Sequence, residues 1–355
     1  MKKNTKLTSI VIMAAFIITT SLACSNGSKQ QQSDATENVD STNNQTAEVK
    51  TFGTQDLATF HLYGPVTVVK YDMGEHSTPC IVIFDDNGKL DSLIGYDEYS
   101  VQETGQVERD KKTGRITRLW WETEAPWVND FEYEGDGIVA PSKYTSNNQT
   151  GNNKEQTFQW NDDGTLGKAT IKEVIHFKEA PQEGSYSVTL SDYDSHGNWT
   201  VCTTHDGEYT TVMHRTINYK GEQQTIKEEL QKEEKILKDF ITDMYNNNRY
   251  ENADFLKAHC QPILLTKLAE AYEYDGEGLA FWLFRTSSQD GKPGNDKTPS
   301  KVLEVKKKGD WYHYTFLDGG WRGENRLKLG LKDGKVYMSD LERVYDESEQ
   351  DHHSE

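Results

Sequence analysis

The chain has 355 residues, with 39 basic and 58 acidic side chains and a formal net charge of −19. Such a charge repels phosphate backbones and anionic head groups, so the composition argues against nucleic-acid binding and against electrostatic docking to a membrane. The four cysteines lack CxxC spacing, which argues against a disulfide framework or a cysteine-rich metal site.

The first 23 residues predict an export signal. Lysines at positions 2, 3 and 6 precede an apolar run over 7–18 that is too short to span a bilayer stably. The sequence Ser21-Leu22-Ala23-Cys24 then resembles a bacterial lipobox, which implies lipidation of Cys24. Ser21 departs from the branched apolar residue usual there, and an ordinary signal peptidase would also cut before Cys24, giving a secreted protein without lipid. Cleavage removes three lysines and no acid, so the net charge changes from −19 to −19 − 3 = −22.

Residues 24–48 are expected to form a disordered tether, because Val39 is their one apolar side chain larger than alanine apart from the anchor cysteine. As a flexible coil such a tether reaches roughly 25–30 Å.

Residues 49–222 predict an all-β antiparallel repeat sheet. Short alternating runs such as 67–72, 80–84 and 186–190 are separated by polar turns that contain glycine. The turn glycines Gly88, Gly114, Gly164 and Gly197 occupy equivalent places in four copies of a hairpin unit, and Gly137 marks a candidate fifth copy. Each is expected to have a positive φ, and neighbouring Asp and Asn side chains to close the turn. A curved sheet is the expected form.

These units resemble the YD (Rhs-type) repeats, and more closely those of uncharacterised lipoproteins of Bacteroides-type bacteria. The resemblance rests on 62–71 followed by 84–90, and on the recurring pattern of an aromatic residue, Asp, two residues, Gly and a polar residue. It implies an outer-membrane lipoprotein in the cell envelope.

Residues 223–346 predict an α+β domain, in which helices precede a meander of strands. One helical stripe carries Ile226, Leu230, Leu237, Phe240, Ile241 and Met244. Further helices are expected from 254 and from Pro262, and strands over 281–287, 301–305, 311–317, 326–332 and 335–345. This order of elements resembles the cone-shaped nuclear-transport-factor-2-like fold, and the stretches 255–291 and 309–344 resemble a domain of unknown function in the same bacterial lipoproteins. Residues 347–355 are expected to form a disordered acidic tail.

Two groups of aromatic residues are candidate binding residues. Trp120, Trp121 and Trp127 fit stacking on a sugar or a peptide, but consecutive strand residues face opposite ways, so Trp120 and Trp121 cannot both contact one ligand. The alternative places one of them in the core. Glu122 and Glu124 share a face and favour solvated charge over a glycosidase pair, which needs two carboxylates across a cleft.

In the second domain the binding candidates are Trp282, Arg285 and Trp321, which are expected to line a pocket of the cone. The resemblance implies an enzymatic alternative, in which His313 or Asp318 serves as a base inside such a pocket. His313 shares a strand face with Trp311 and Thr315, and a structural histidine is the competing interpretation.

The stretch 192–200, DYDSHGNWT, begins like a calcium loop, but the twelfth position holds Thr203 and strands flank it instead of helices. It is therefore interpreted as a hairpin turn with an exposed His196 and without a metal. The sequence allows two states for Cys80 and Cys202: a disulfide between them, or two small buried thiols.

No P-loop, GxGxxG, HExxH or GxSxG motif occurs, and no cofactor is expected. The sequence thus favours a lipid-anchored envelope protein acting as a non-enzymatic interaction or ligand-binding module, with an unknown envelope protein or a glycan as partner. Ser25 to Lys29 lack acids after the cysteine, which favours the periplasmic side over the cell surface.

Overall fold

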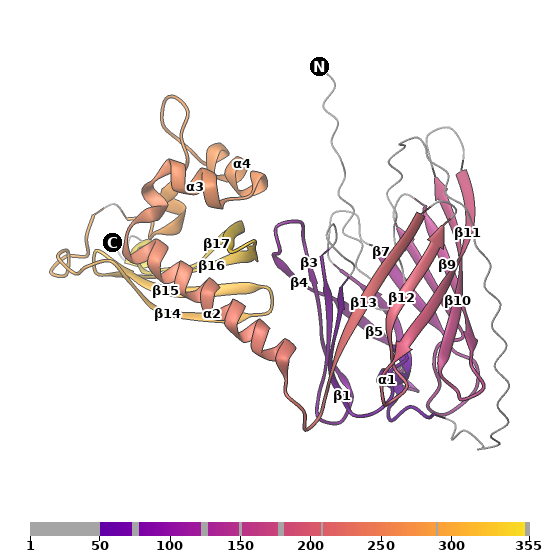
Figure 1. The fold of residues 1–355 in the computed structure, drawn as a ribbon. Helices are drawn as coiled ribbons and strands as arrows, with labels where there is room; N and C mark the ends of the chain where they lie inside the picture. The colour runs from indigo at the N-terminus through magenta and orange to yellow at the C-terminus, as the bar shows by residue number, and fades with distance from the viewer. Residues whose placement is uncertain are drawn as a thin grey trace.

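In the computed structural model the described residues are 50–72, 78–121, 127–148, 151–176, 181–206, 209–288 and 290–351. They form a 13-stranded antiparallel sheet and a smaller four-stranded antiparallel sheet, with a few helices, and so they are mostly antiparallel β (Figure 1). The large sheet is formed by the first part of the chain, and the helices and the small sheet follow it. This order agrees with the predicted order of an all-β region followed by helices and strands. A cone-shaped second domain is not among the features the structure establishes.

The large sheet is a meander whose two ends meet. Its strands are β1 (Val66–Asp72), β2 (Cys80–Phe84), β3 (Leu90–Tyr96), β4 (Gln102–Thr104), β5 (Gln106–Arg109), β6 (Ile116–Trp120), β7 (Trp127–Glu132), β8 (Lys143–Asn148), β9 (Asn153–Trp160), β10 (Leu166–His176), β11 (Pro181–Tyr193), β12 (Trp199–Asp206) and β13 (Tyr209–Tyr219).

The order of the strands explains why the sheet is nearly closed. β1 pairs with β13, while β4 and β5 occupy the two ends of the order, and Gly105 alone separates them in the sequence. The Gly105 N–H donates to the Leu93 carbonyl at 2.7 Å, so the chain steps directly from one edge of the sheet to the other. The sheet is therefore curved, as the sequence predicts, and it curves far enough to bring its two edges together.

The inward face of this sheet is apolar and the outward face is largely polar. Along β11, Tyr186, Val188 and Leu190 are buried, and the intervening Ser187 and Thr189 are exposed. Alternation of this kind places one face of each strand in a core and the other in contact with solvent. One buried cluster, which includes Leu119, Ile171, Met213 and their neighbours, lies on the inside.

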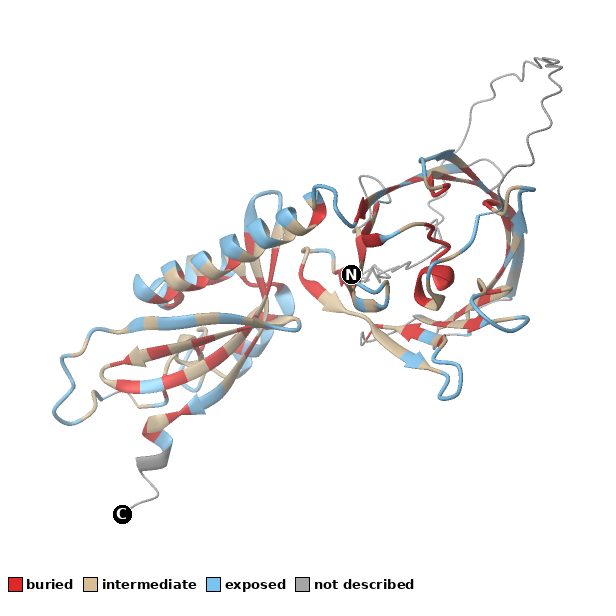
Figure 2. Cartoon of the chain, turned by 90° about the horizontal axis from the view of Figure 1, so that it is seen from below, coloured by how far each residue is buried: buried red, intermediate tan, exposed pale blue. Residues whose placement is uncertain are grey.

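Residues 50–65, here called the plug segment, lie inside the ring of strands. The segment contains the short helix α1 (Gln55–Thr59), and Ala58, Phe60 and Leu62 have no exposed surface. Figure 2 shows buried helix and coil within the ring. The Thr54 side chain accepts from the Leu57 N–H and begins the helix.

The small sheet has the order β14 (Lys301–Lys308), β15 (Trp311–Asp318), β16 (Trp321–Lys332) and β17 (Lys335–Asp346). Against it pack α2 (Thr225–Asn246), η1 (Arg249–Glu251), α3 (Ala253–His259), α4 (Pro262–Glu270) and η2 (Phe281–Phe284), and α5 (Glu347–Asp351) follows. The core between them includes Leu237, Ile241, Tyr314 and Phe316.

Two local predictions for this part differ from the structure. Residues 281–284 form a 3-10 turn instead of the start of a strand, which buries Phe284 completely. Residues 347–351, expected in a disordered tail, form α5, because Asp346 accepts from the Ser348 N–H at 3.0 Å and caps the helix. Residues 352–355 lie outside the described residues.

The two sheets touch through side chains and backbone. The first turns of α2 pack Ile226 on the outer face of the large sheet, beside Ile81 and Ile94. Farther along, Val101 forms an antiparallel bridge with Gly330 of β16. A hollow of about 140 Å³ lies beside α2 at this junction.

Candidate functional site

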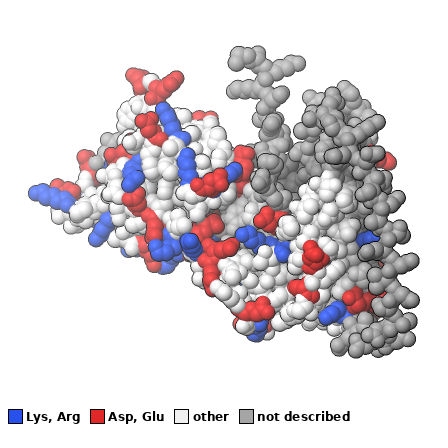
Figure 3. All heavy atoms as spheres, in the orientation of Figure 1, with Lys and Arg blue, Asp and Glu red and all other residues white. Residues whose placement is uncertain are grey.

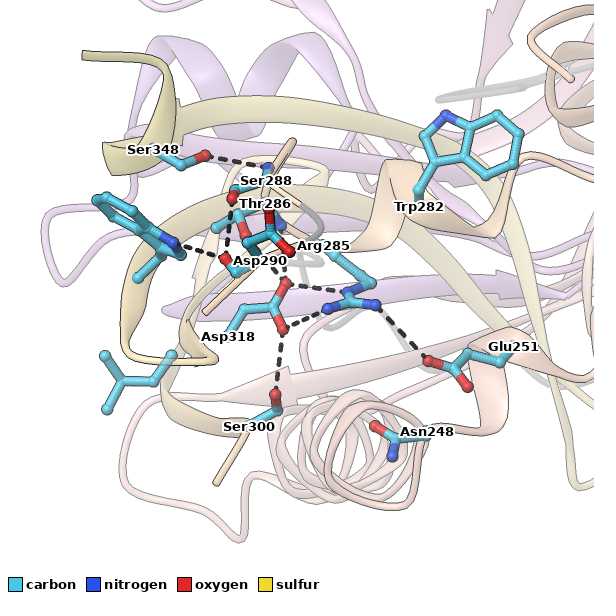
Figure 4. A network of polar contacts seen from close by, with 12 residues as sticks. Asn248, Glu251, Trp282, Arg285, Thr286, Ser288, Asp290, Ser300, Asp318 and Ser348 are labelled. Atoms are coloured by element: carbon cyan, nitrogen blue, oxygen red, sulfur yellow. Dashed lines mark hydrogen bonds and ion pairs between the residues drawn. The ribbon is translucent and has the colours of Figure 1, made fainter. Parts of the chain in front are cut away.

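The carboxylate of Asp318, at the end of β15, is held by three neighbouring side chains. Arg285 donates from Nε at 3.0 Å and from Nη2 at 2.9 Å, while Thr286 and Ser300 donate their hydroxyl groups at 2.9 and 3.1 Å. The side chain is 2% exposed (Figure 4). A carboxylate with both oxygens bonded in this way is a structural anchor, because it has little capacity left to take a proton from a substrate.

His313 does not lie beside Asp318. Along β15 the residues Tyr312, Tyr314, Phe316 and Asp318 are buried and those between them are only half-buried, so His313 belongs to the opposite face. Its Nδ1 lies 2.8 Å from Oε1 of Glu324 on β16. The pleat therefore separates the two residues of the enzymatic alternative, and Asp318 faces a core filled with aromatic rings.

Arg285 and Trp321 are also fixed by structural contacts. The Arg285 guanidinium bonds Asp318, and its Nη1 lies 4.0 Å from Oε1 of Glu251. Trp321 is 7% exposed and its Nε1 donates to the Asp290 carbonyl at 2.9 Å. These two binding candidates thus serve the packing at one end of the small sheet.

Trp282 has a different setting. Its indole points away from the Asp318 network in Figure 4. It packs with Tyr272 and Tyr274, with ring centres 5.7 and 5.6 Å away, and Tyr272 and Tyr274 are 5.7 Å apart. We call these three residues the aromatic triad. Tyr274 is 58% exposed and the other two are half-buried, so part of the triad faces solvent.

The loop 271–280 that follows α4 builds the triad. Gly278 lies directly against the Tyr272 ring, since a Cβ there would come 2.2 Å from Cζ. Glu273, Asp275 and Glu277 are exposed on the same loop. Figure 1 shows this loop projecting beyond α4, and Figure 3 shows acidic side chains at its tip. The triad therefore has an acidic rim.

The candidate residues Trp120 and Trp121 of the large sheet face opposite sides of the sheet, as consecutive strand residues do. Trp121 is 3% exposed and belongs to the inner core, whereas Trp120 is half-buried. The side chain of Trp127 lies outside the described residues, as do residues 122–126. Only Trp120 of the described pair is accessible to a ligand from outside.

The stretch 192–200 is a hairpin turn between β11 and β12. Gly197 has φ +89°, and Gly88, Gly114 and Gly164 have φ +72°, +71° and +82°. Asp194 Oδ1 accepts from the N–H groups of His196 and Asn198, both at 2.9 Å. Because successive strands run antiparallel, these four turns lie at one end of the sheet.

His196 differs from the prediction of an exposed side chain. It is half-buried, and its ring stacks on Tyr219 with the ring centres 4.1 Å apart. Gly64 of the plug segment lies against the other side of this ring, because a Cβ there would come 2.4 Å from Cδ2. Among the described residues no group of three or more His, Cys, Asp or Glu is arranged to hold a metal ion.

Asn198 joins the turn to the plug segment. Its Oδ1 accepts from the Tyr63 N–H, and its Nδ2 donates to the Tyr63 carbonyl and to the Tyr219 hydroxyl, each at 2.8 Å. Other turns at this end also bind the segment: the Thr54 hydroxyl donates to the Gly88 carbonyl at 2.7 Å, and the Tyr63 hydroxyl to the Gly164 carbonyl at 2.6 Å. The repeat turns thus hold the plug segment in place.

Cys80 and Cys202 are buried free thiols, and desolvation raises the pKa of Cys202 to about 12. Cys24 lies outside the described residues. No helix in the described part of the chain is long and apolar enough to cross a membrane.

Sequence reasoning did not single out Tyr272 and Tyr274. The signal was available: two tyrosines and three acids lie in a glycine-containing loop, YEYDGEG, just before Trp282. Tyr272 was instead assigned to the helix that begins at Pro262.

Comparison with known proteins places few limits on function. No family model matches the chain, and no curated protein matches it. Among solved structures, a porin-like protein from Bacteroides uniformis ATCC 8492 is 11% identical, and the match covers 44% of this chain and 99% of that chain with a TM-score of 0.22.

Proposed function

We propose that this protein is a lipid-anchored envelope protein that acts as a non-enzymatic interaction module, and that the aromatic triad is its recognition surface. The observation that carries the proposal is the solvent-facing group Tyr272, Tyr274 and Trp282 with its acidic rim. Tyr and Trp are the residue types that dominate binding energy at interfaces, because their large rings bury much area at a small entropic cost.

The partner is a protein segment rich in lysine or arginine. Three exposed carboxylates, Glu273, Asp275 and Glu277, surround the triad, and the whole chain carries a net charge of −19. A basic segment gains from both features, since its charges meet the rim and its cations can lie over the ring faces. A glycan would use the rings but gain nothing from the rim charge.

The enzymatic alternative has weaker support. Both oxygens of Asp318 are occupied by Arg285, Thr286 and Ser300, and His313 lies on the other face of β15. These contacts favour binding over acid–base catalysis in this part of the chain.

Site-specific photo-crosslinking in the native cell tests the proposal. A photoreactive amino acid at position 274 is expected to give a protein adduct whose crosslinked segment is basic, and a matched position, 303 on β14, is expected to give none. Leu303 is a suitable control because it is 45% exposed in the same part of the chain. Equal adducts at both positions, or a triad-dependent glycan ligand without a protein adduct, would contradict the proposal.

The anchor and its location are tested separately. Metabolic labelling with a fatty-acid analogue is expected to modify the wild-type chain and not Cys24→Ala. Protease treatment of intact cells is expected to leave the protein whole, because we place it on the periplasmic side of the outer membrane. Digestion in intact cells would assign it to the cell surface instead.

A further inference from the structure

Arg215, on β13, lies inside the large sheet. It is 3% exposed and alternates along the inward face with Met213 and Tyr219. Its Nε donates to the Trp199 carbonyl, and its guanidinium carbon lies 3.7 Å from the centre of the Trp199 ring. The group is therefore held rigidly by a backbone contact and by stacking on an aromatic ring.

The two terminal nitrogens of this guanidinium, Nη1 and Nη2, are buried and, apart from a contact with the Tyr71 hydroxyl, have no hydrogen-bond partner among the described residues. No acidic side chain among the described residues forms an ion pair with it. Asp194, the acid that acts on it electrostatically, uses Oδ1 for the backbone of its own turn and Oδ2 for the Tyr219 hydroxyl. The guanidinium charge thus has no carboxylate bonded to it among the residues that the structure describes.

The other titratable groups near Arg215 supply no negative charge. Desolvation, and then the charge of Arg215, lower the pKa of His61 to about 3, so this imidazole is neutral. Desolvation raises the pKa of Tyr71 to about 12 and that of the Cys202 thiol to about 12, so both are protonated.

Tyr71 provides a further donor. It is the residue directly across from Arg215 in the pairing of β1 with β13, and it has no exposed surface. Its hydroxyl is in hydrogen-bond contact with the guanidinium and has no other hydrogen-bond partner among the described residues. Two guanidinium nitrogens and one hydroxyl therefore lie together, buried, with no acidic side chain of the described residues bonded to them.

Buried arginine is rare without a partner, because an uncompensated charge and unmade hydrogen bonds are both costly in an apolar interior. The two terminal nitrogens form a fork that matches the two oxygens of a carboxylate. We propose that the inside of the large sheet binds a monocarboxylate, which Arg215 holds through two hydrogen bonds and Tyr71 through a third. One positive charge matches a monoanion better than a phosphate dianion, and the neighbouring Trp199, Cys202 and Met213 favour an organic acid with an apolar body. This site is separate from the aromatic triad.

The test uses the full mature chain with Cys24→Ser, so that no lipid is attached. The melting temperature is followed during titration with sodium octanoate, sodium acetate or sodium chloride at constant ionic strength. The wild-type protein is expected to gain stability with rising octanoate, less with acetate, and not with chloride, because a ligand that binds the folded state raises its stability by mass action.

Arg215→Met is expected to weaken octanoate binding at least tenfold, and Tyr71→Phe several-fold. Arg118→Met is the matched control, since Arg118 lies on the outer face and pairs with Asp130, and it is expected to respond like the wild type. If Arg215→Met does not fold, Arg215→Lys, which keeps the charge and loses the fork, is expected to show the same tenfold loss. No octanoate response of the wild type, or an equal response of the wild type and the Arg215 variant, would overturn the proposal.

Discussion

Replacing Asn198 by alanine is expected to release the plug segment. Asn198 has no exposed surface, and its amide makes three hydrogen bonds, two of them to the backbone of Tyr63. The substitution leaves the Tyr63 N–H and carbonyl buried without partners, and each unsatisfied group costs about 1–3 kcal/mol. We therefore expect the free energy of unfolding to fall by about 3 kcal/mol.

For a folded unit of this size, a loss of that magnitude lowers the melting temperature by roughly 6–12 °C. Differential scanning calorimetry measures this shift, and limited chymotrypsin digestion reports on the plug segment itself. Phe60 and Leu62 have no exposed surface in the native protein, so cleavage after them requires the segment to leave the ring. We expect cleavage there in Asn198→Ala well below its melting temperature.

Ser195→Ala provides the control in the same turn, because Ser195 is exposed and its hydroxyl makes only a 3.5 Å contact with His196. Its stability should stay within about 0.5 kcal/mol of the wild type. If Asn198→Ala melts within a degree of the wild type and resists chymotrypsin, the turn does not hold the plug segment and the reasoning is wrong.

Three further predictions concern the junction and the small sheet. Asp318→Asn should lower the free energy of unfolding, measured in urea, by about 2–3 kcal/mol, because it leaves Arg285 without its carboxylate partner. An unchanged midpoint of the urea transition would refute this. Burial of the Glu103 carboxyl, and to a smaller extent the charge of Asp97, raise its pKa from 4.5 to about 7. Between these two pH values the folded state keeps a proton on Glu103 that the unfolded state loses. The stability that this bound proton contributes is complete below about pH 4.5 and is lost as the pH rises through about 7. Glu103→Gln should therefore reduce the difference in unfolding free energy between pH 5 and pH 8 by about 1–2 kcal/mol after screening. An unchanged difference would argue against this. Gly330→Val should separate the two sheets without unfolding them, since a Cβ at 330 would come 2.4 Å from the backbone of Ser100; small-angle scattering should show a more extended particle, and an unchanged profile would contradict this.

The sequence predicts the strands well where local chemistry decides the outcome. Alternating residues and glycine turns mark the hairpins, and Gly88 and Gly197 have the positive φ that their turns need. Closure could not be predicted in the same way. It depends on β1 meeting β13 and on one residue, Gly105, joining β4 to β5, and both are long-range events without a local pattern.

The plug segment was missed for a similar reason. Residues 50–65 follow a polar tether, and the short apolar stretch around Leu57 and Phe60 suggests neither a helix nor a strand. Asn198 looks like any turn asparagine, and its role appears only when Tyr63 lies beside it. His196 was expected in solvent because its turn is polar, and Tyr219, which covers it, is 23 residues away in the sequence.

In the second half of the chain, periodicity predicts α2 and the alternation of β15, including the separation of His313 from Tyr314. The role of Asp318 follows from its bonds to Arg285, a contact across 33 positions that spacing does not reveal. Trp282 is among the aromatic candidates that the sequence suggests, whereas its two tyrosine partners come from a loop that carries no periodic signal.

The most direct test of the proposed function is crosslinking from position 274, where a photoreactive phenylalanine analogue keeps an aromatic ring in the triad, in cells that carry either Gly278 or Gly278→Val. The valine side chain would displace the Tyr272 ring, which lies against Gly278, and leave the acidic rim unchanged. We expect a basic protein adduct with the intact triad and its loss, by tenfold or more, in the variant, with the same amount of folded protein in both. An adduct of equal yield in both would show that the triad is not the recognition surface.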